Sequence, residues 1–303
     1  MKTLISVVGT TGIGKTKLAI DLARHFSTEI ISCDSRQFFR EMKIGTAAPS
    51  EEELASAKHH FVGNLSVENY YSIGQFEHDT LQLLEDLFKE KDIVIMVGGS
   101  MMYEKAVIEG LNDLPEANAE NQQKLDEIYK NEGLGKLQEM LQNLDPEYYR
   151  NVDIHNPRRL LRAIDIIWQT GKTYTENIST PQNARNFKTV RIGIEAPREI
   201  IYERINLRVD KMLENGLLTE AENIFKIKKE HPDLASLNTV GYSELFKYFE
   251  NEWTFDFAVS EIKKNSRRFA KRQLTWYRKE ENILWVNYTN PFAESLSLLK
   301  DLL

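Results

Sequence analysis

The feature that most constrains this chain is a glycine-rich segment near its N-terminus. The segment fits the pattern G-x-x-x-x-G-K-[ST] and reads Gly9-Thr10-Thr11-Gly12-Ile13-Gly14-Lys15-Thr16. An apolar run typical of a buried strand precedes it (4–8), and a segment with helical spacing follows it (15–25). In that context the main-chain N–H groups and Lys15 hold phosphate oxygens, and the Thr16 hydroxyl can ligate Mg²⁺. The segment therefore predicts a diphosphate or triphosphate site, and a turn that binds nothing is a poor alternative.

Short apolar runs alternate with helical patterns at both ends of the chain. Further strands are predicted at 29–33, 92–97, 189–195 and 283–286, and further helices at 72–89, from 197 to about 280, and after Pro291. This alternation favours an α/β fold, with a P-loop NTPase-like parallel sheet core flanked by helices.

The middle of the chain has helical patterns and no strand patterns. We therefore expect an all-helical insertion at 113–188, which splits the catalytic core into 1–112 and 189–303. Within the insertion, Asn156-Pro157 begins a clear helix that Gly171 ends. The polar stretch 173–188 is expected to be a loop.

Composition excludes several classes of protein. The single cysteine, Cys33, rules out a disulfide scaffold and a four-cysteine zinc site. No apolar stretch reaches about 18 residues and no signal-peptide pattern is present, so we expect no membrane span and a cytoplasmic location. The adjacent His59 and His60 lack further metal ligands at suitable spacing and are interpreted as loop residues.

Positive charge is concentrated in one segment, although the whole chain has a net charge of −7. Residues 261–280 hold eight basic and two acidic side chains. On a helix, these basic side chains lie opposite an apolar face that includes Phe269 and Trp276. Solvated faces usually mix charges of both signs, so this face favours a polyanion such as RNA. A second basic cluster, Arg158-Arg159 with Arg162, lies in the helix that begins at Pro157.

Polar residues follow the second and third predicted strands, at the edge of the sheet where α/β proteins bind ligands. Asp34 could organise Mg²⁺ through water, act as a general base, or cap a helix. Gly98-Gly99 suggest a close approach of the backbone to a ligand, and Ser100 could cap the next helix, contact that ligand, or do both. From the spacing alone, these alternatives stay open.

Together these motifs resemble the bacterial tRNA dimethylallyltransferases, also called tRNA isopentenyltransferases, over nearly the whole chain. One matching segment is the glycine-rich segment at 9–16, which we call the phosphate loop. The others are 34–37, 44–47, 59–60, 98–100, 156–163, 208–213, 240–242 and 270–276. The last of them, Ala270-Lys271-Arg272-Gln273-Leu274-Thr275-Trp276, is the most specific.

The resemblance implies an enzyme that transfers a dimethylallyl group from dimethylallyl diphosphate to N6 of adenosine 37 in tRNA and releases diphosphate. It implies that Asp34 is the base and that Ser100 lies close to the reacting groups. Charge on the leaving diphosphate would be stabilised by Lys15, Arg208 and Mg²⁺ on Thr16. The adenine would be flipped out of the anticodon loop into a channel that meets the diphosphate.

The resemblance also implies an extended contact with the tRNA anticodon stem-loop, made by the helical insertion and by parts of the core, in an enzyme that we expect to be a monomer. The residues expected to contact tRNA are Asp34, Ser35, Arg36, Gln37, Ser100, Gln122, Arg158, Arg159, Leu160, Leu161, Arg162, Asn238, Thr239, Val240, Gly241, Tyr242, Ser243, Arg268 and Arg272.

Several positions depart from the family's pattern. The usual Gly-Pro-Thr-Ala of the phosphate loop is Gly9-Thr10-Thr11-Gly12, and the usual threonine after the glycine pair is Ser100. Ala48 and the uncharged Gln122 stand where the family often has a lysine and an arginine. These differences suggest an altered affinity for tRNA.

Three rival interpretations remain. A P-loop small-molecule kinase would turn over ATP, but it leaves the basic helix and the insertion unexplained. A nucleotide-switched RNA-binding protein explains the basic helix but needs a conformational switch that no motif supplies. An adenylate isopentenyltransferase that acts on free nucleotides would not need the residues expected to grip tRNA.

Overall fold

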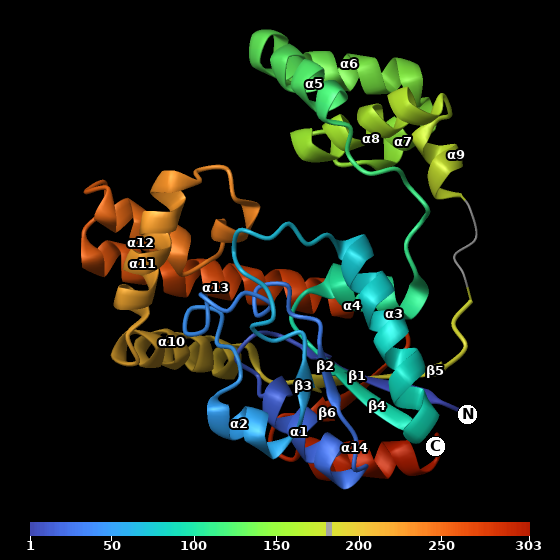
Figure 1. Cartoon of the computed structure of the whole chain (residues 1–303), viewed down its shortest axis with the longest axis vertical. Coiled ribbons are helices and arrows are strands. Elements are labelled where there is room, and N and C mark those ends of the chain that lie inside the picture. The colour runs from blue at the N-terminus through green and yellow to red at the C-terminus, as the bar shows by residue number, and fades with distance from the viewer. Residues whose placement is uncertain (180–183) are drawn as a thin grey trace. The chain divides into compact units, whose positions relative to one another are not determined.

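A computed structural model describes residues 1–179 and 184–303 (Figure 1). The chain divides into two compact units, a core of Met1–Ile108 with Arg185–Leu303 and a helical unit of Glu109–Ala184. The limits expected for the insertion, 113 and 188, each lie four residues later than these bounds. Within the described residues, no helix is both long and apolar enough to cross a membrane.

The core is built on a parallel sheet with the strand order β3-β2-β4-β1-β5-β6. Its strands are β1 (Thr3–Gly9), β2 (Ile30–Ser32), β3 (His59–His60), β4 (Ile93–Val97), β5 (Lys188–Glu195) and β6 (Ile283–Asn287). The interpretation of His59 and His60 as loop residues is wrong, because they form an edge strand in register with Ile30 and Ile31. A strand of two residues is too short to show an alternating pattern in the sequence.

Helices cover both faces of the sheet. Successive residues of a strand point to opposite faces, and Leu4 and Ile5 of β1 accordingly belong to different apolar clusters. One cluster joins the sheet to α1, α10, α13 and α14, and the other joins it to α3 and α4. The core helices are α1 (Lys15–His25), α2 (Glu51–Ser56), α3 (Ile73–Glu90), α4 (Met101–Glu109), α10 (Arg198–Glu214), α11 (Leu217–Glu230), α12 (Tyr242–Phe249), α13 (Phe255–Tyr277) and α14 (Pro291–Lys300). The α/β class predicted from the sequence is confirmed.

The basic segment forms most of α13, but the helix is shifted from its predicted bounds. It begins six residues before 261, because the Thr254 side chain accepts a hydrogen bond from Phe257 N and caps the first turn. It ends at Tyr277, before Glu280. This helix runs from a third apolar cluster, shared with α11 and α12, to the sheet.

The helical unit consists of α5 (Ala119–Glu132), α6 (Leu134–Leu144), α7 (Pro146–Asn151), α8 (Pro157–Thr170) and α9 (Tyr174–Ile178). As expected, α8 begins at Pro157 and ends at Gly171, which has a left-handed φ of 68°. The loop expected at 173–188 is partly wrong, because α9 begins there with a capping box formed by Thr173 and Glu176. Residues 180–183 of that stretch lie outside the described residues.

Candidate active site

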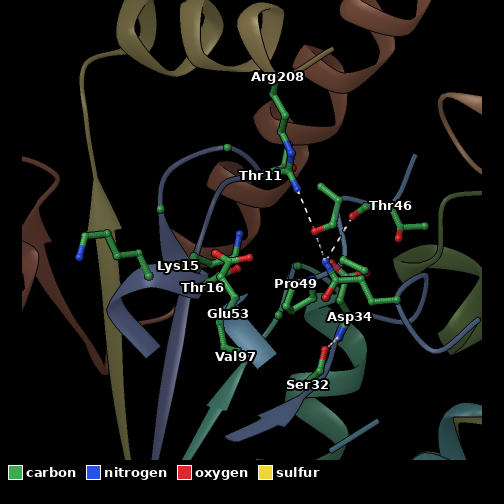
Figure 2. A pocket seen from close by; sticks show the side chains of 18 of the residues that line it. Thr11, Lys15, Thr16, Ser32, Asp34, Thr46, Pro49, Glu53, Val97 and Arg208 are labelled. Atoms are coloured by element: carbon green, nitrogen blue, oxygen red, sulfur yellow. Dashed lines mark hydrogen bonds between the residues drawn. The ribbon is translucent and has the colours of Figure 1, made fainter. Parts of the chain in front are cut away.

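A cavity of 540 Å³ lies beyond the carboxyl ends of the parallel strands, as expected for an α/β sheet (Figure 2). Segments far apart in the sequence meet around it: the phosphate loop, the residues after β2 and β4, the turn at 46–49, and helices α10 and α13. Eight of the predicted site residues line it together, namely Thr11, Gly12, Gly14, Lys15, Thr16, Asp34, Gln37 and Arg208.

The phosphate loop has the conformation that its glycines permit. Gly12 and Gly14 have φ values of 78° and 109°, which side chains other than glycine rarely adopt. Lys15 Nζ donates to the carbonyl oxygen of Thr10 over 2.9 Å, and burial lowers the pKa of Lys15 to about 8. A negative ligand would favour the charged form of this lysine again, so the loop is suited to an anion.

Arg208 is a further cation of the cavity and extends into it from α10 (Figure 2). Its Nη1 donates to Thr11 Oγ1 over 2.9 Å, and its Nη2 donates to the carbonyl oxygen of Ala47 over 3.4 Å. Burial lowers the pKa of Arg208, although the charge of Asp34 opposes that shift. The two cations, Lys15 and Arg208, therefore face one cavity with their positions set before any ligand binds.

Asp34 follows β2 and does not cap a helix. Its Oδ1 accepts a hydrogen bond from the main-chain N–H of Arg36 over 3.1 Å, which forms a local Asx turn. The residues that follow it form turns, and the next helix, α2, begins only at Glu51. The helix-cap alternative for Asp34 is therefore wrong, and its carboxylate lines the cavity.

Gly98 and Gly99 allow the end of β4 to pack closely against other parts of the protein. A Cβ at Gly98 would lie 2.5 Å from the carbonyl carbon and from Sγ of Cys33, and one at Gly99 would lie 2.9 Å from Gln273 Nε2. The sequence suggested that the glycines allow a close approach to a ligand. The structure shows that they also let the neighbouring strand end, with Asp34, come close to β4, and both glycines line the cavity, so a close approach to a ligand stays a prediction.

Ser100 contacts the residue next to Asp34. Its Oγ accepts a hydrogen bond from the main-chain N–H of Ser35 over 2.9 Å and lies 2.9 Å from Ser35 Oγ. The hydroxyl that the sequence singled out is therefore beside the candidate base, on the segment expected to meet the target nucleotide.

Gln273 is a site residue to which the sequence interpretation gave no role. Its side chain is fully buried; Oε1 accepts from Thr11 N and Nε2 donates to Gly99 O, each over 2.8 Å. It therefore ties the phosphate loop to the end of β4. A signal was present, because Gln273 is a polar residue on the buried face of α13, between Ala270 and Tyr277.

His59 also lines the cavity. Its Nδ1 lies 2.8 Å from the carbonyl oxygen of Ala57, so Nδ1 carries the proton of the neutral ring. Burial lowers the pKa of His59, which favours that neutral ring. The other ring nitrogen, Nε2, is buried and has no hydrogen-bond partner among the residues that the structure describes.

The segments expected to contact tRNA in the core differ in exposure. Asn238, Arg268 and Arg272 are exposed. Arg36 Nη1 donates to the carbonyl oxygens of Ala235 and Ser236 over 3.4 and 3.3 Å, just before 238–243. The sequence did not predict these hydrogen bonds of Arg36, because they join segments about 200 residues apart.

Two of the side chains expected to contact tRNA are completely buried. Tyr242 is 0% exposed and donates its hydroxyl to Glu220 over 2.6 Å, and Leu160 is 0% exposed in the apolar core of the helical unit. A side-chain contact with RNA is therefore wrong for both residues. Both residues belong to segments that resemble the family's tRNA-contact segments, but their side chains pack beneath the surface of the protein.

Within the helical unit, Gln122, Arg158 and Arg159 are exposed. Arg162 is instead engaged inside the unit, because its Nη1 donates over 3.0 Å to the carboxylate of Asp165, which is 1% exposed. In the predicted basic cluster, Arg158 and Arg159 are exposed and form no ion pair with the residues that the structure describes, whereas Arg162 is paired.

The basic face of α13 is partly neutralised by neighbours. Lys263 pairs with Asp210 over 2.6 Å and Lys264 pairs with Glu261 over 2.7 Å, whereas Arg267 donates to the uncharged Asn206 of α10 and keeps its charge. The positive charge that remains toward solvent therefore comes mainly from the exposed Arg268 and Arg272 and their neighbours.

The cavity offers oxygen ligands for a metal ion. Thr16, Asp34 and Glu53 line it, whereas the described residues contain no cluster of three His, Cys, Asp or Glu side chains that could hold a metal ion by themselves. Mg²⁺ prefers oxygen ligands and is usually held by one or two side chains together with phosphate oxygens and water. The residues present therefore fit Mg²⁺ that arrives with a bound diphosphate.

Comparison with known proteins gives a consistent result. The model of the IPP transferase family matches residues 37–280. A tRNA dimethylallyltransferase of Christiangramia forsetii is 50% identical over 285 residues, which are 94% of this chain and 93% of the relative. One from Flavobacterium johnsoniae is 48% identical over 295 residues, 95% of this chain and 94% of the relative. The crystal structure of the tRNA isopentenylpyrophosphate transferase of Bacillus halodurans, 31% identical, has a TM-score of 0.73 over 100% of this chain and 95% of that chain.

Proposed function

The chain belongs to the IPP transferase family of prenyltransferases, and from that premise we propose that it transfers a dimethylallyl group from dimethylallyl diphosphate to N6 of adenosine 37 in tRNA. One observation carries the proposal: a single cavity is lined by the phosphate loop, the half-buried cations Lys15 and Arg208, and Asp34. That arrangement combines an anion site for a leaving diphosphate with a base for the attacking amine.

The phosphate loop and the two cations bind the diphosphate. In the reaction, the bond between C1 of the allyl group and the diphosphate oxygen breaks, and the released diphosphate gains negative charge. Lys15, Arg208 and the loop N–H groups stabilise that charge because their positions are already set. Thr16, which lines the cavity, would hold Mg²⁺ that arrives with the diphosphate, and this ion would supply further positive charge there.

Asp34 takes the proton from the attacking nitrogen. The adenine N6 amine is a weak nucleophile because its lone pair is delocalised into the ring, and it must lose a proton as its bond to C1 forms. The Asp34 carboxylate faces the cavity and accepts that proton, while the Ser100 hydroxyl accepts a hydrogen bond from the main-chain N–H of Ser35 and holds the residue next to Asp34.

The tRNA is held mainly by exposed cations. Arg158 and Arg159 of the helical unit and Arg268 and Arg272 of α13 bind phosphates of the anticodon stem-loop. The target base is flipped out of its stack to reach the cavity. We propose that the enzyme acts in the cytoplasm as a monomer.

A labelling experiment tests this function. The purified protein is incubated with Mg²⁺, labelled dimethylallyl diphosphate and an unmodified tRNA with adenosine at positions 36 and 37. We expect label in the tRNA, and none when position 37 is changed. Parallel reactions with AMP as the acceptor, and with ATP and no tRNA, test the rival enzymes: label on AMP or consumption of ATP without label in tRNA would overturn the proposal.

A further inference from the structure

We propose that Glu220 is a positioning residue for the donor site, because its carboxylate holds in place the loop that forms one wall of the cavity. The identity of the donor rests on the proposed function. The contacts that support the positioning role do not, because they lie within the protein.

Glu220, on α11, binds three successive main-chain N–H groups. Its Oε2 accepts from Lys43 N over 3.0 Å, both oxygens accept from Ile44 N over 3.0 and 2.9 Å, and Oε1 accepts from Gly45 N over 2.9 Å. A row of N–H groups that converge on one anion is a strong arrangement, because hydrogen bonds to a charged acceptor are about twice as strong as neutral ones. The start of the loop at 43–49 is thus fixed by one side chain that lies 175 residues or more away.

Tyr242 completes this attachment. Its hydroxyl donates to Glu220 Oε1 over 2.6 Å, and its ring packs directly on the loop. A Cβ at Gly45 would lie 2.5 Å from Cζ of Tyr242, so only glycine fits at this position. Burial and the Glu220 carboxylate both raise the pKa of Tyr242, so the hydroxyl keeps the proton that it donates.

The far end of the same loop forms the cavity wall beside Arg208. The Ala47 carbonyl oxygen accepts from Arg208 Nη2 over 3.4 Å and from Gln37 Nε2 over 3.0 Å, and residues 46–49 line the cavity. Glu220 is not among the residues that line it. Glu220 therefore acts on the donor through the loop, by fixing the wall against which Arg208 is oriented.

The test is the substitution Glu220→Gln, which keeps the side chain's size and removes its charge. An amide has one acceptor oxygen and directs its NH₂ group at donors, so the three N–H groups cannot all be satisfied. We expect the KM for dimethylallyl diphosphate to rise about tenfold. The kcat at saturating donor and the KM for tRNA should stay within about twofold. The matched control is Glu222→Gln, an exposed carboxylate on the same helix, which should change none of these values.

Two further variants separate positioning from general stability. Glu220→Asp keeps the charge and should recover part of the donor affinity, and Tyr242→Phe removes one hydroxyl and should raise the donor KM less than Glu220→Gln does. An unchanged donor KM in Glu220→Gln would overturn the proposal. So would a proportional fall of kcat, donor affinity and tRNA affinity with a lower Tm, because that pattern describes a general loss of folding.

Calorimetric titration with inorganic diphosphate and Mg²⁺ keeps this inference distinct from the proposed function. If the wild-type protein binds diphosphate but labels no tRNA, the proposed function fails, and weaker diphosphate binding by Glu220→Gln still supports the positioning role. Equal diphosphate binding by wild type and Glu220→Gln, or none by either protein, contradicts that role. Amide exchange at Lys43, Ile44 and Gly45 should also be faster in Glu220→Gln, and unchanged protection would count against it.

Discussion

The cavity proposed to bind the donor and the surface expected to bind tRNA hold their cations in different ways. In the cavity, Lys15 and Arg208 are half-buried and hydrogen-bonded to Thr10 and Thr11 of the phosphate loop. On the surface, the arginines at 158–159 are exposed in solvent. A leaving group needs charges that are positioned before the reaction, whereas a polyanion needs only charge within reach and releases counterions when it binds. Changes in the cavity should therefore alter chemistry and donor affinity, and changes on the surface should alter salt-dependent tRNA binding.

The largest effect is expected inside the cavity, from Asp34→Asn. The amide keeps the shape of the side chain and an oxygen for the Arg36 N–H, but it cannot accept the proton from N6. The single-turnover rate should fall about 10³-fold with little change in tRNA affinity. The surface variant Asp86→Asn is the control and should react normally. A near-normal rate for Asp34→Asn would remove Asp34 as the base.

Salt should have an effect of similar size on the affinity of the exposed surface for tRNA. If six tRNA phosphates are contacted, the affinity for tRNA falls roughly 10³-fold between 50 and 200 mM salt. Binding of the donor, which would meet the half-buried cations of the cavity, should change far less over the same range. Filter binding for tRNA and calorimetry for inorganic diphosphate measure the two responses. A flat salt profile for tRNA would mean that the exposed arginines do not grip it.

The next effect concerns the phosphate loop. Lys15→Ala removes a half-buried charge that would face the bound diphosphate, and it should raise the donor KM about 100-fold. The KM for tRNA should be unchanged, because Lys15 lies in the cavity and not on the exposed surface. Initial rates at low donor concentration are the measurement. An unchanged rate there would contradict the assigned role of Lys15.

The same lysine predicts a pH dependence. Its pKa is lowered to about 8 in the protein, so its charge is lost as the pH rises through that value. Only the protonated form attracts the diphosphate. The donor kcat/KM should therefore be constant below about pH 7 and fall up to tenfold per pH unit above about pH 8. In Lys15→Ala this decline should be absent, and a decline that persists would have another origin.

Local patterns in the sequence predict one part of the site and miss another, for a physical reason. The phosphate loop is contiguous, so its spacing alone indicates an anion site, and the position of Asp34 follows from the rule that parallel strands end at one edge. Gln273 contacts Thr11 across 262 positions, and Glu220 contacts the loop at 43–45 across about 175. Such contacts depend on how helices α11 and α13 pack on the core, and no local pattern records that.

Burial of individual side chains is the second property that the resemblance to family segments does not predict. Tyr242 and Leu160 lie in segments that resemble tRNA-contact regions, yet both side chains are fully buried. A segment that forms a surface needs residues under it as well as on it. Periodicity shows this for Leu160, because α8 has a strongly one-sided apolar pattern. Periodicity does not predict the burial of Tyr242, because this residue is the first of its helix and no helical turn precedes it.

The smallest effects should distinguish two arginines of α8. Arg158 is exposed, and Arg158→Ala should weaken tRNA binding modestly, lower the salt slope by about one and leave stability unchanged. Arg162 pairs with the buried Asp165, and Arg162→Ala should lower the stability of the helical unit by about 1–2 kcal/mol. That value is below the loss for a fully buried pair, because the Arg162 side chain is 36% exposed and Asn121 and Gln169 also donate to Asp165. Urea unfolding and tRNA titration of the two variants measure both quantities. If Arg162→Ala changed only tRNA binding and Arg158→Ala changed only stability, the division between paired and exposed cations would be wrong.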